Sequence, residues 1–362
     1  MKNSRLQDWP EPIVRVQSLS ETCQSEIPTR YIKPPRDRPA TLTSPIAGND
    51  VNIPVIDLAG LFGDDYDLHA STLHKISMAC REWGFFQVVN HGVSPELMDS
   101  GRELWRRFFH LPMEEKQIYA NSPATYEGYG SRLGVEKGAI LDWSDYYFLH
   151  YLPFSLKNLN KWPALPTNCR EVIDEYGKQV LELCGRLMKV LSINLGLGEK
   201  HLQDAFGGDN VGACLRVNFY PKCPRPDLAL GLSSHSDPGG MTLLLPDDQV
   251  AGLQVRHGND WTTVKPVSHA FIVNIGDQIQ VLSNAIYKSV EHRVIVNSAQ
   301  ERVSLAFFYN PKSDKLIEPV SDLVTEETPS LYQPMTFDEY RIYIRTMGPR
   351  GKSQVESLKS PR

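Results

Sequence analysis

The sequence predicts an α+β protein in which a barrel or jelly roll of short strands is flanked by helices. Between residues 211 and 312, short apolar runs are separated by clusters of Gly, Pro, Asn and Asp, which is typical of strands joined by turns. In the preceding part of the chain, apolar side chains instead recur at helical spacing. A last helix is expected at 336–347, before a polar tail.

The pattern divides the chain into four regions. Residues 1–50 hold seven prolines and many polar side chains, so we expect an extended, loosely structured N-terminal arm. The next region, 51–205, should be mainly helical, and it is followed by the jelly-roll core at 211–312 and by a C-terminal helix and tail at 313–362. Within the second region, short strands are expected at 53–57 and from residue 84, and helices at 66–83, 95–109, 113–118 and 167–195.

Composition excludes several classes of partner. The net charge of −5 gives no basic surface, so we expect no nucleic-acid partner. Six cysteines without CxxC spacing indicate reduced thiols rather than a disulfide framework. No stretch approaches the ~20 apolar residues of a membrane span, and the N-terminus has no apolar signal segment. We therefore expect a soluble cytoplasmic protein with no membrane partner, and we predict no oligomeric state.

Three residues form a candidate metal centre. His235 and Asp237 are two residues apart, so on an extended strand they point to the same face. His292 lies in a second strand, within a stripe of valines that is expected to face the barrel interior. Two imidazoles and one carboxylate can hold a divalent iron on one face and leave three coordination positions open.

Two other interpretations of these residues are open. A lone inward histidine is usually a hydrogen-bonded core residue, although the His-x-Asp pair on another strand disfavours this interpretation here. Zinc is the competing metal, but structural zinc usually takes four protein ligands, often thiolates. Non-haem iron is favoured because the three ligands leave open positions.

Two strands carry polar side chains suited to a carboxylate. Strand alternation places Arg302 and Ser304 on one face, where a guanidinium fork and a hydroxyl can capture a carboxylate. Arg216, Asn218 and Tyr220 share one face of another strand in the same way. The alternative is that both sets are solvent faces of ordinary amphipathic strands.

The C-terminal helix carries two further arginines. Arg341 and Arg345 are four residues apart and so lie on one helix face. Basic residues near a helix C-terminus often face solvent, which is the alternative here. If they face the core together with Arg216, three guanidiniums around an apolar pocket would suit a small lipophilic acid.

Several segments are similar to the plant 2-oxoglutarate- and Fe(II)-dependent dioxygenases: IPVID at 53–57, WGFFQVVNHG at 83–92, NFYPKCP at 218–224, HSD at 235–237 and RVS at 302–304. The resemblance implies a distorted double-stranded β-helix core with iron held by His235, Asp237 and His292. It also implies that 2-oxoglutarate and O2 are co-substrates and that ascorbate is the reductant. The residues implied to bind 2-oxoglutarate are Asn218, Tyr220, Arg302 and Ser304.

The segments 121–150, 205–208, 304–311 and 358–362 are similar to one group within this family, the jasmonate-induced oxygenases of plants. That resemblance implies hydroxylation of jasmonic acid at carbon 12, with succinate and CO2 as co-products, which lowers active jasmonate signalling in plant defence. The residues implied to bind the substrate are Arg216, Arg341, Arg345, Phe148 and Phe308. No catalytic residue is expected beyond the metal centre.

Two rival functions are open at this point. Flavonoid-oxidising dioxygenases, such as flavonol and anthocyanidin synthases, share the iron motif, but a flavonoid has no carboxylate to occupy the arginines. A non-catalytic ligand-binding relative would keep the fold without turnover. The intact candidate triad and the Arg302–Ser304 pair argue against that second function.

Overall fold

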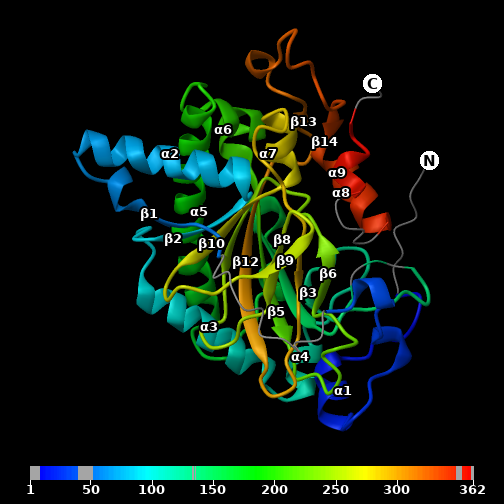
Figure 1. The fold of residues 1–362 in the computed structure, drawn as a ribbon. Coiled ribbons are helices and arrows are strands. Elements are labelled where there is room, and N and C mark those ends of the chain that lie inside the picture. The colour runs from blue at the N-terminus through cyan, green and yellow to red at the C-terminus, as the bar shows by residue number, and fades with distance from the viewer. Residues whose placement is uncertain (1–8, 40–51, 133, 135, 348–352, 360–362) are drawn as a thin grey trace.

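The computed structural model describes residues 9–39, 52–132, 134, 136–347 and 353–359, without the side chains of 345–347, 353 and 354 (Figure 1). The strands are β1 (Val55–Asp57), β2 (Phe85–Val89), β3 (Gly128–Gly130), β4 (Asp145–Leu152), β5 (Gly212–Tyr220), β6 (Leu232–His235), β7 (Met241–Leu245), β8 (Leu253–His257), β9 (Asp260–Thr263), β10 (Phe271–Ile275), β11 (His292–Val294), β12 (Arg302–Asn310), β13 (Leu316–Ile317) and β14 (Met335–Thr336). The helices are α1 (Val16–Thr22), α2 (Tyr66–Glu82), α3 (Pro95–Phe109), α4 (Met113–Gln117), α5 (Cys169–Asn194), α6 (His201–Phe206), α7 (Asp277–Leu282), α8 (Phe337–Met347) and α9 (Ser353–Glu356).

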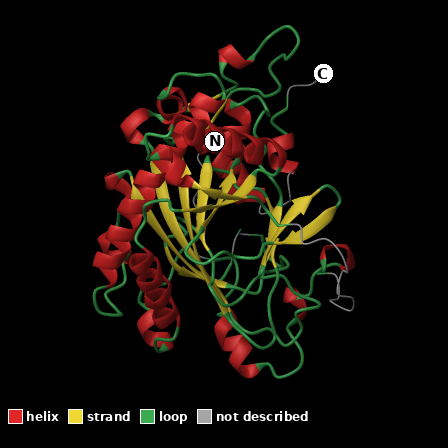
Figure 2. Ribbon diagram, turned by 60° about the vertical axis from the view of Figure 1, so that its left-hand side comes forward, coloured by secondary structure: helices red, strands yellow, loops and turns green. Residues whose placement is uncertain are grey.

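Two sheets form the core. The larger sheet has eight strands in the order β1-β2-β10-β7-β12-β5-β4-β3, and the smaller has four in the order β6-β11-β8-β9. Figure 2 shows the two sheets facing each other, which is the jelly-roll arrangement predicted from the sequence. Helices α2, α3 and α5 lie on the other side of the larger sheet (Figure 1). The predicted α+β class and jelly-roll core are therefore confirmed.

The strongly periodic segments were predicted correctly. The helices expected at 66–83, 95–109, 113–118, 167–195 and 336–347 are present as α2, α3, α4, α5 and α8. The long helix α5 buries a continuous apolar stripe that includes Val180, Leu183 and Leu187. Such a stripe is stabilised by packing against the sheet, so its spacing is visible in the sequence.

The sequence did not reveal the strands between α4 and α5. Strand β4 pairs with β5 from Asp145, opposite Phe219, to Leu152, opposite Ala213, and so extends the larger sheet. Its residues are all buried or half-buried, and aromatic side chains are found on both faces. Alternation of polar and apolar residues, the usual signal of a half-buried strand, is therefore weak in this segment.

The expectation of an extended, loose arm is wrong for its described part, 9–39. This segment contains α1 and two short 3-10 turns, and it buries Val16, Ile27 and Tyr31. The carboxylate of Asp145 on β4 accepts hydrogen bonds of 2.9 Å from the backbone N–H groups of Val16 and Gln17. A buried carboxylate that caps α1 from another part of the chain leaves no local signal in residues 1–50.

None of the helices in the described ranges combines the length and the apolar character needed to cross a membrane. The longest of them, α5, carries charged residues along its exposed side.

We predict that Asp145→Ala destabilises the protein by roughly 2–4 kcal/mol, because three donors, the N–H groups of Val16 and Gln17 and the hydroxyl of Ser131, lose their buried acceptor. Urea denaturation followed by circular dichroism measures the free energy of unfolding. Asp64→Ala, at an exposed site, is the matched control and should change stability by less than about 0.5 kcal/mol. Equal stability of the two variants would contradict the capping role of Asp145.

Candidate active site

The three candidate metal ligands meet between the two sheets. His235 ends β6, His292 begins β11, and the two residues are paired across these neighbouring strands. Asp237 does not lie on the strand with His235, as the sequence suggested, but in the loop that follows it. One ligand atom from each residue can be chosen so that all three lie within 4.8 Å of one another. Asp237 Oδ1 lies 3.5 Å from His235 Nε2 and 3.7 Å from His292 Nε2.

Backbone carbonyls set the orientation of both imidazoles. His235 Nδ1 lies 2.8 Å from the carbonyl oxygen of Ser233, and His292 Nδ1 lies 3.2 Å from that of Val290. A carbonyl accepts only, so each Nδ1 carries the proton and each Nε2 presents a lone pair toward Asp237. This is the usual arrangement of metal-binding histidines, in which the second ring nitrogen is held by an outer partner.

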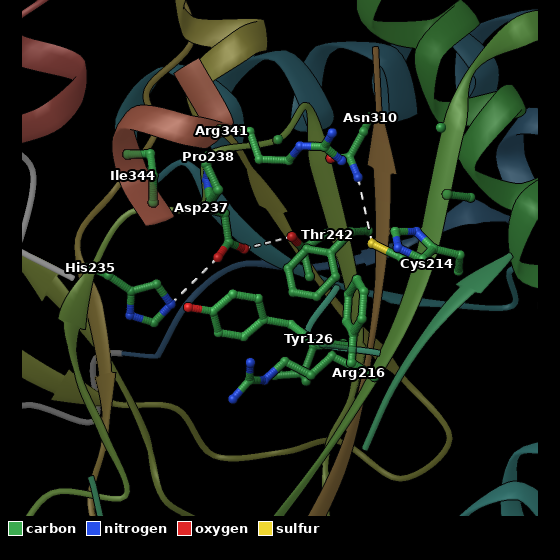
Figure 3. Close-up of a pocket in the computed structure, with 18 of the residues that line it drawn as sticks. Tyr126, Cys214, Arg216, His235, Asp237, Pro238, Thr242, Asn310, Arg341 and Ile344 are labelled. Carbon is green, nitrogen blue, oxygen red and sulfur yellow. Dashed lines mark hydrogen bonds and ion pairs between the residues drawn. The ribbon is translucent and has the colours of Figure 1, made fainter. Parts of the chain in front are cut away.

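Two residues that the sequence analysis missed hold the aspartate. The hydroxyl of Thr242 on β7 and the side-chain amide of Asn274 on β10 both donate to Asp237 Oδ2, at 2.6 and 2.8 Å. Thr242 and Asn274 are register partners on adjacent strands. Figure 3 shows Asp237 between His235 and Thr242. The second oxygen, Oδ1, therefore stays directed toward the histidines.

The charges of the cluster suit a cation. Burial opposes ionisation of Asp237, but the neighbouring His292 and His235 hold the pKa of its carboxyl well below the usual range. Burial, together with the charge of His235, lowers the pKa of His292 to about 4. Burial also opposes the charged form of His235, but the neighbouring carboxylate of Asp237 raises its pKa. An ionised carboxylate beside imidazole lone pairs is the donor set that binds divalent iron, so these residues fit the metal.

The polar faces of β5 and β12 line the barrel interior and are not solvent faces. Arg302 is paired with Tyr220 and Ser304 with Asn218 across the two strands, and all four side chains line one cavity. Arg302 and Asn218 are only 4% and 5% exposed. The Arg302 guanidinium donates to Ser304 Oγ at 3.3 Å and lies 5.2 Å from the centre of the Tyr220 ring. A bound carboxylate would complete the hydrogen bonding of this guanidinium.

Four of the five predicted substrate residues line the same cavity. The exception is Arg345, whose side chain lies outside the described residues. Arg216 donates to Asn218 Oδ1 at 2.7 Å, and its guanidinium lies 4.0 Å from the centre of the Tyr146 ring. Phe148 on β4 and Phe308 on β12 also line the cavity.

The C-terminal helix supplies one described arginine to the cavity wall. Arg341 lines the cavity from α8 (Figure 3), and one of its terminal nitrogens is paired with Asp338. Its Nε is buried and has no hydrogen-bond partner among the residues that the structure describes. The side chain of Arg345 lies outside the described residues.

The cavity has a volume of about 590 Å³ and runs from the histidines to α8. Its wall is mostly apolar, and its polar groups include the His–Asp–His cluster, the Arg302 group and the two arginines Arg216 and Arg341. Such a cavity, apolar with a few directional polar groups, is typical of a small-molecule site.

Comparisons with known families agree with this geometry. The model of the 2OG-Fe(II) oxygenase superfamily matches residues 211–311, and that of the N-terminal region of non-haem dioxygenases in morphine synthesis matches residues 53–165. The chain belongs to the 2OG-Fe(II) oxygenases, and it is an Fe(II)- and 2-oxoglutarate-dependent dioxygenase.

Within this class, the chain is similar to several jasmonate-induced oxygenases of Arabidopsis thaliana. Jasmonate-induced oxygenase 1 of Arabidopsis thaliana is 68% identical over 98% of this chain and 88% of its own length. Jasmonate-induced oxygenase 2 of the same plant is 67% identical over 100% of this chain and 97% of its own length. The crystal structure of JOX2 in complex with 2OG, Fe and JA superposes with a TM-score of 0.91, at 68% identity, and covers 98% of this chain and 100% of that one.

We predict that Thr242→Val weakens binding of a divalent metal about tenfold, because Asp237 loses one of the two hydrogen bonds that orient it. Calorimetric titration of the metal-free protein with Mn2+ under nitrogen measures the affinity. Thr262→Val on β9, outside the cavity wall, is the matched control and should bind Mn2+ as the wild type does. An unchanged affinity in Thr242→Val would show that Asn274 alone orients the carboxylate.

Proposed function

We propose that this protein hydroxylates jasmonic acid to 12-hydroxyjasmonate, with succinate and CO2 as co-products, and so lowers active jasmonate signalling. The observation that carries the proposal is the 68% identity, over nearly the whole chain, to a protein whose structure was solved with 2OG, Fe and JA. The two arginines in the apolar cavity, Arg216 and Arg341, supply the cationic groups that an acid of this size needs.

In this proposal His235 Nε2, Asp237 Oδ1 and His292 Nε2 hold Fe(II). The distal carboxylate of 2-oxoglutarate pairs with Arg302 and Ser304, with Asn218 and Tyr220 beside it. When bound, the iron with 2-oxoglutarate and O2 supplies the oxidising power that replaces a C–H bond by C–OH, and ascorbate keeps the metal reduced.

The protein's own contribution is position and exclusion of water. Arg216 and Arg341 would hold the carboxylate and the ring ketone of the substrate, while Phe148 and Phe308 pack on its hydrocarbon parts. Arg345 is included among the substrate-binding residues because of the sequence alone, since it follows Arg341 by four residues. No acid–base residue is needed, because the substrate carbon loses a hydrogen atom and not a proton to a side chain.

The geometry disfavours the two rival functions. A flavonoid lacks a carboxylate, so it would leave the guanidinium of Arg216 without an anion in a largely apolar cavity. A non-catalytic binder has no need of a His–Asp–His cluster whose aspartate is held by two dedicated donors. The cysteines, all free thiols, support a reducing compartment, and we propose the cytoplasm.

An anaerobically reconstituted assay tests the proposal. Protein with Fe(II), ascorbate, 2-oxoglutarate and jasmonic acid is started with O2, and mass spectrometry follows hydroxylated product while succinate is quantified. Equal amounts of succinate and 12-hydroxyjasmonate are expected. Succinate without hydroxylated jasmonate would reject the substrate and redirect the search to flavonoids.

We predict that Asp237→Ala abolishes turnover, a greater loss than the ~10–100-fold that outer partners of a metal site cost. The carboxylate is the only anionic group of the cluster, so its removal takes away both a ligand and the charge that attracts the metal. Product formation is measured together with the circular dichroism spectrum, which should show a folded protein. Wild-type turnover in this variant would remove Asp237 from the metal site.

We predict that Arg341→Ala raises KM for jasmonic acid by roughly 10–100-fold, the range expected for one charge-assisted hydrogen bond. The KM for 2-oxoglutarate should stay unchanged, because Arg341 on α8 is separate from the Arg302 group. Arg36→Ala, at an exposed site remote from the cavity, is the matched control. An unaltered KM for the acid would place Arg341 outside the substrate site.

A further inference from the structure

Tyr126 has a backbone conformation that bulky residues rarely adopt. Its φ is +58°, in the left-handed region, although its side chain is aromatic and only 9% of the residue is exposed. Residues keep such a conformation when their surroundings fix it, and they gather at ligand sites. The backbone N–H of Tyr126 donates to the carbonyl of Ser122 at 2.8 Å, which closes a tight turn at this point.

The Tyr126 ring faces the cavity and not the core. Tyr126 lines the same cavity as Arg216 and His235 (Figure 3), and Phe148 is part of the same wall. It belongs to neither of the two hydrophobic core clusters found among the described residues, whereas its neighbour Tyr129 does. A buried aromatic side chain that borders a ligand cavity can pack on the hydrocarbon part of a ligand held there.

The N-terminal segment holds Tyr126 in place. The ring of Trp9 packs edge-on against the Tyr126 ring, with centroids 5.5 Å apart and planes at 85°. The indole N–H of Trp9 also donates to the carbonyl of Asn121 at 3.3 Å. Trp9 therefore contacts both the start of this turn and the side chain that it presents.

Glu11 contacts the part of the chain that follows this turn, at Arg132 and Gly138. Its carboxylate accepts from the backbone N–H of Gly138 at 2.9 Å and from Arg132 Nη1 at 3.2 Å. Arg132 in turn donates to the carbonyl of Gly134, which also lines the cavity. The described part of the cavity wall between Tyr126 and Gly134 is thus anchored at both ends by residues 9–11.

We propose that Tyr126 is a substrate-binding residue whose ring packs on the hydrocarbon part of a small lipophilic acid, and that Trp9 is a positioning residue that acts through it. The inference rests on the proposed function and deepens it, because it makes the N-terminal segment a part of the substrate site. Specificity then depends on residues that are more than a hundred positions from the metal ligands in the sequence.

Four variants test this inference. Tyr126→Asn removes the ring but keeps a residue that tolerates left-handed backbone, so the fold should survive. Tyr126→Phe keeps the ring. Trp9→Ala removes the support, and Trp9→Phe retains an aromatic ring at the same place.

The measurement is the Kd of jasmonic acid and, separately, of 2-oxoglutarate, by calorimetry on the full-length Fe(II)-loaded protein under nitrogen. Tyr126→Asn should weaken binding of jasmonic acid about tenfold, and Trp9→Ala about threefold or more, with the two Phe variants close to wild type. The Kd of 2-oxoglutarate should stay the same in all four, because its proposed site at Arg302 and Ser304 lies on β12. Succinate formed per hydroxylated product should rise in Tyr126→Asn, since a loosely held acid is oxidised less often.

The outcomes separate the two proposals. Wild-type protein that binds 2-oxoglutarate but not jasmonic acid would reject the proposed function, and this inference with it. Wild-type binding together with an unchanged Kd in Tyr126→Asn would reject the inference alone. Equal losses for jasmonic acid and 2-oxoglutarate would show a merely structural role for Tyr126 and overturn the assignment. A loss in Tyr126→Phe as large as in Tyr126→Asn would overturn the contact with the ring.

Discussion

The rest of the site depends on one buried carboxylate, which is contacted by side chains from two sides. Asp237 lies in the connection between β6 of the smaller sheet and β7 of the larger one. Its Oδ1 faces the two histidines, which the smaller sheet carries, while its Oδ2 is held by Thr242 and Asn274 of the larger sheet. A buried charge is tolerated only when it is paired and hydrogen-bonded, so the two sheets must meet at this residue.

The same rule explains the other charges inside the barrel. The guanidiniums of Arg302 and Arg216 are placed on neighbouring strands, where Ser304, Asn218 and aromatic rings satisfy part of their hydrogen-bonding and electrostatic demand. Neither guanidinium is ion-paired with a carboxylate among the described residues, which suits them to anionic ligands. Part of the interior of this jelly roll is therefore a polar cavity and not packed core, because these strands direct charged side chains inward.

Segments distant in the chain complete the wall. Asp145 begins β4, the strand that places Phe148 in the cavity, and the same carboxylate caps α1. One residue thus couples the folding of the N-terminal segment to the shape of the cavity. Val16 and Tyr31 are buried in one hydrophobic cluster with side chains from the rest of the chain, such as Trp143. Their burial stabilises this arrangement, since apolar side chains of both segments are removed from water.

The sequence by itself determined the long helices, the jelly-roll class and the candidate metal triad, because helical periodicity, strand alternation and the His-x-Asp spacing are local patterns. It also predicted that Arg302 and Ser304 share a face. Only the tertiary structure decided that the N-terminal segment is folded, that β4 joins the larger sheet, and that Thr242 and Asn274 hold Asp237. These features depend on hydrogen bonds between residues far apart in the chain, and such partners leave no periodic or local signal in either segment.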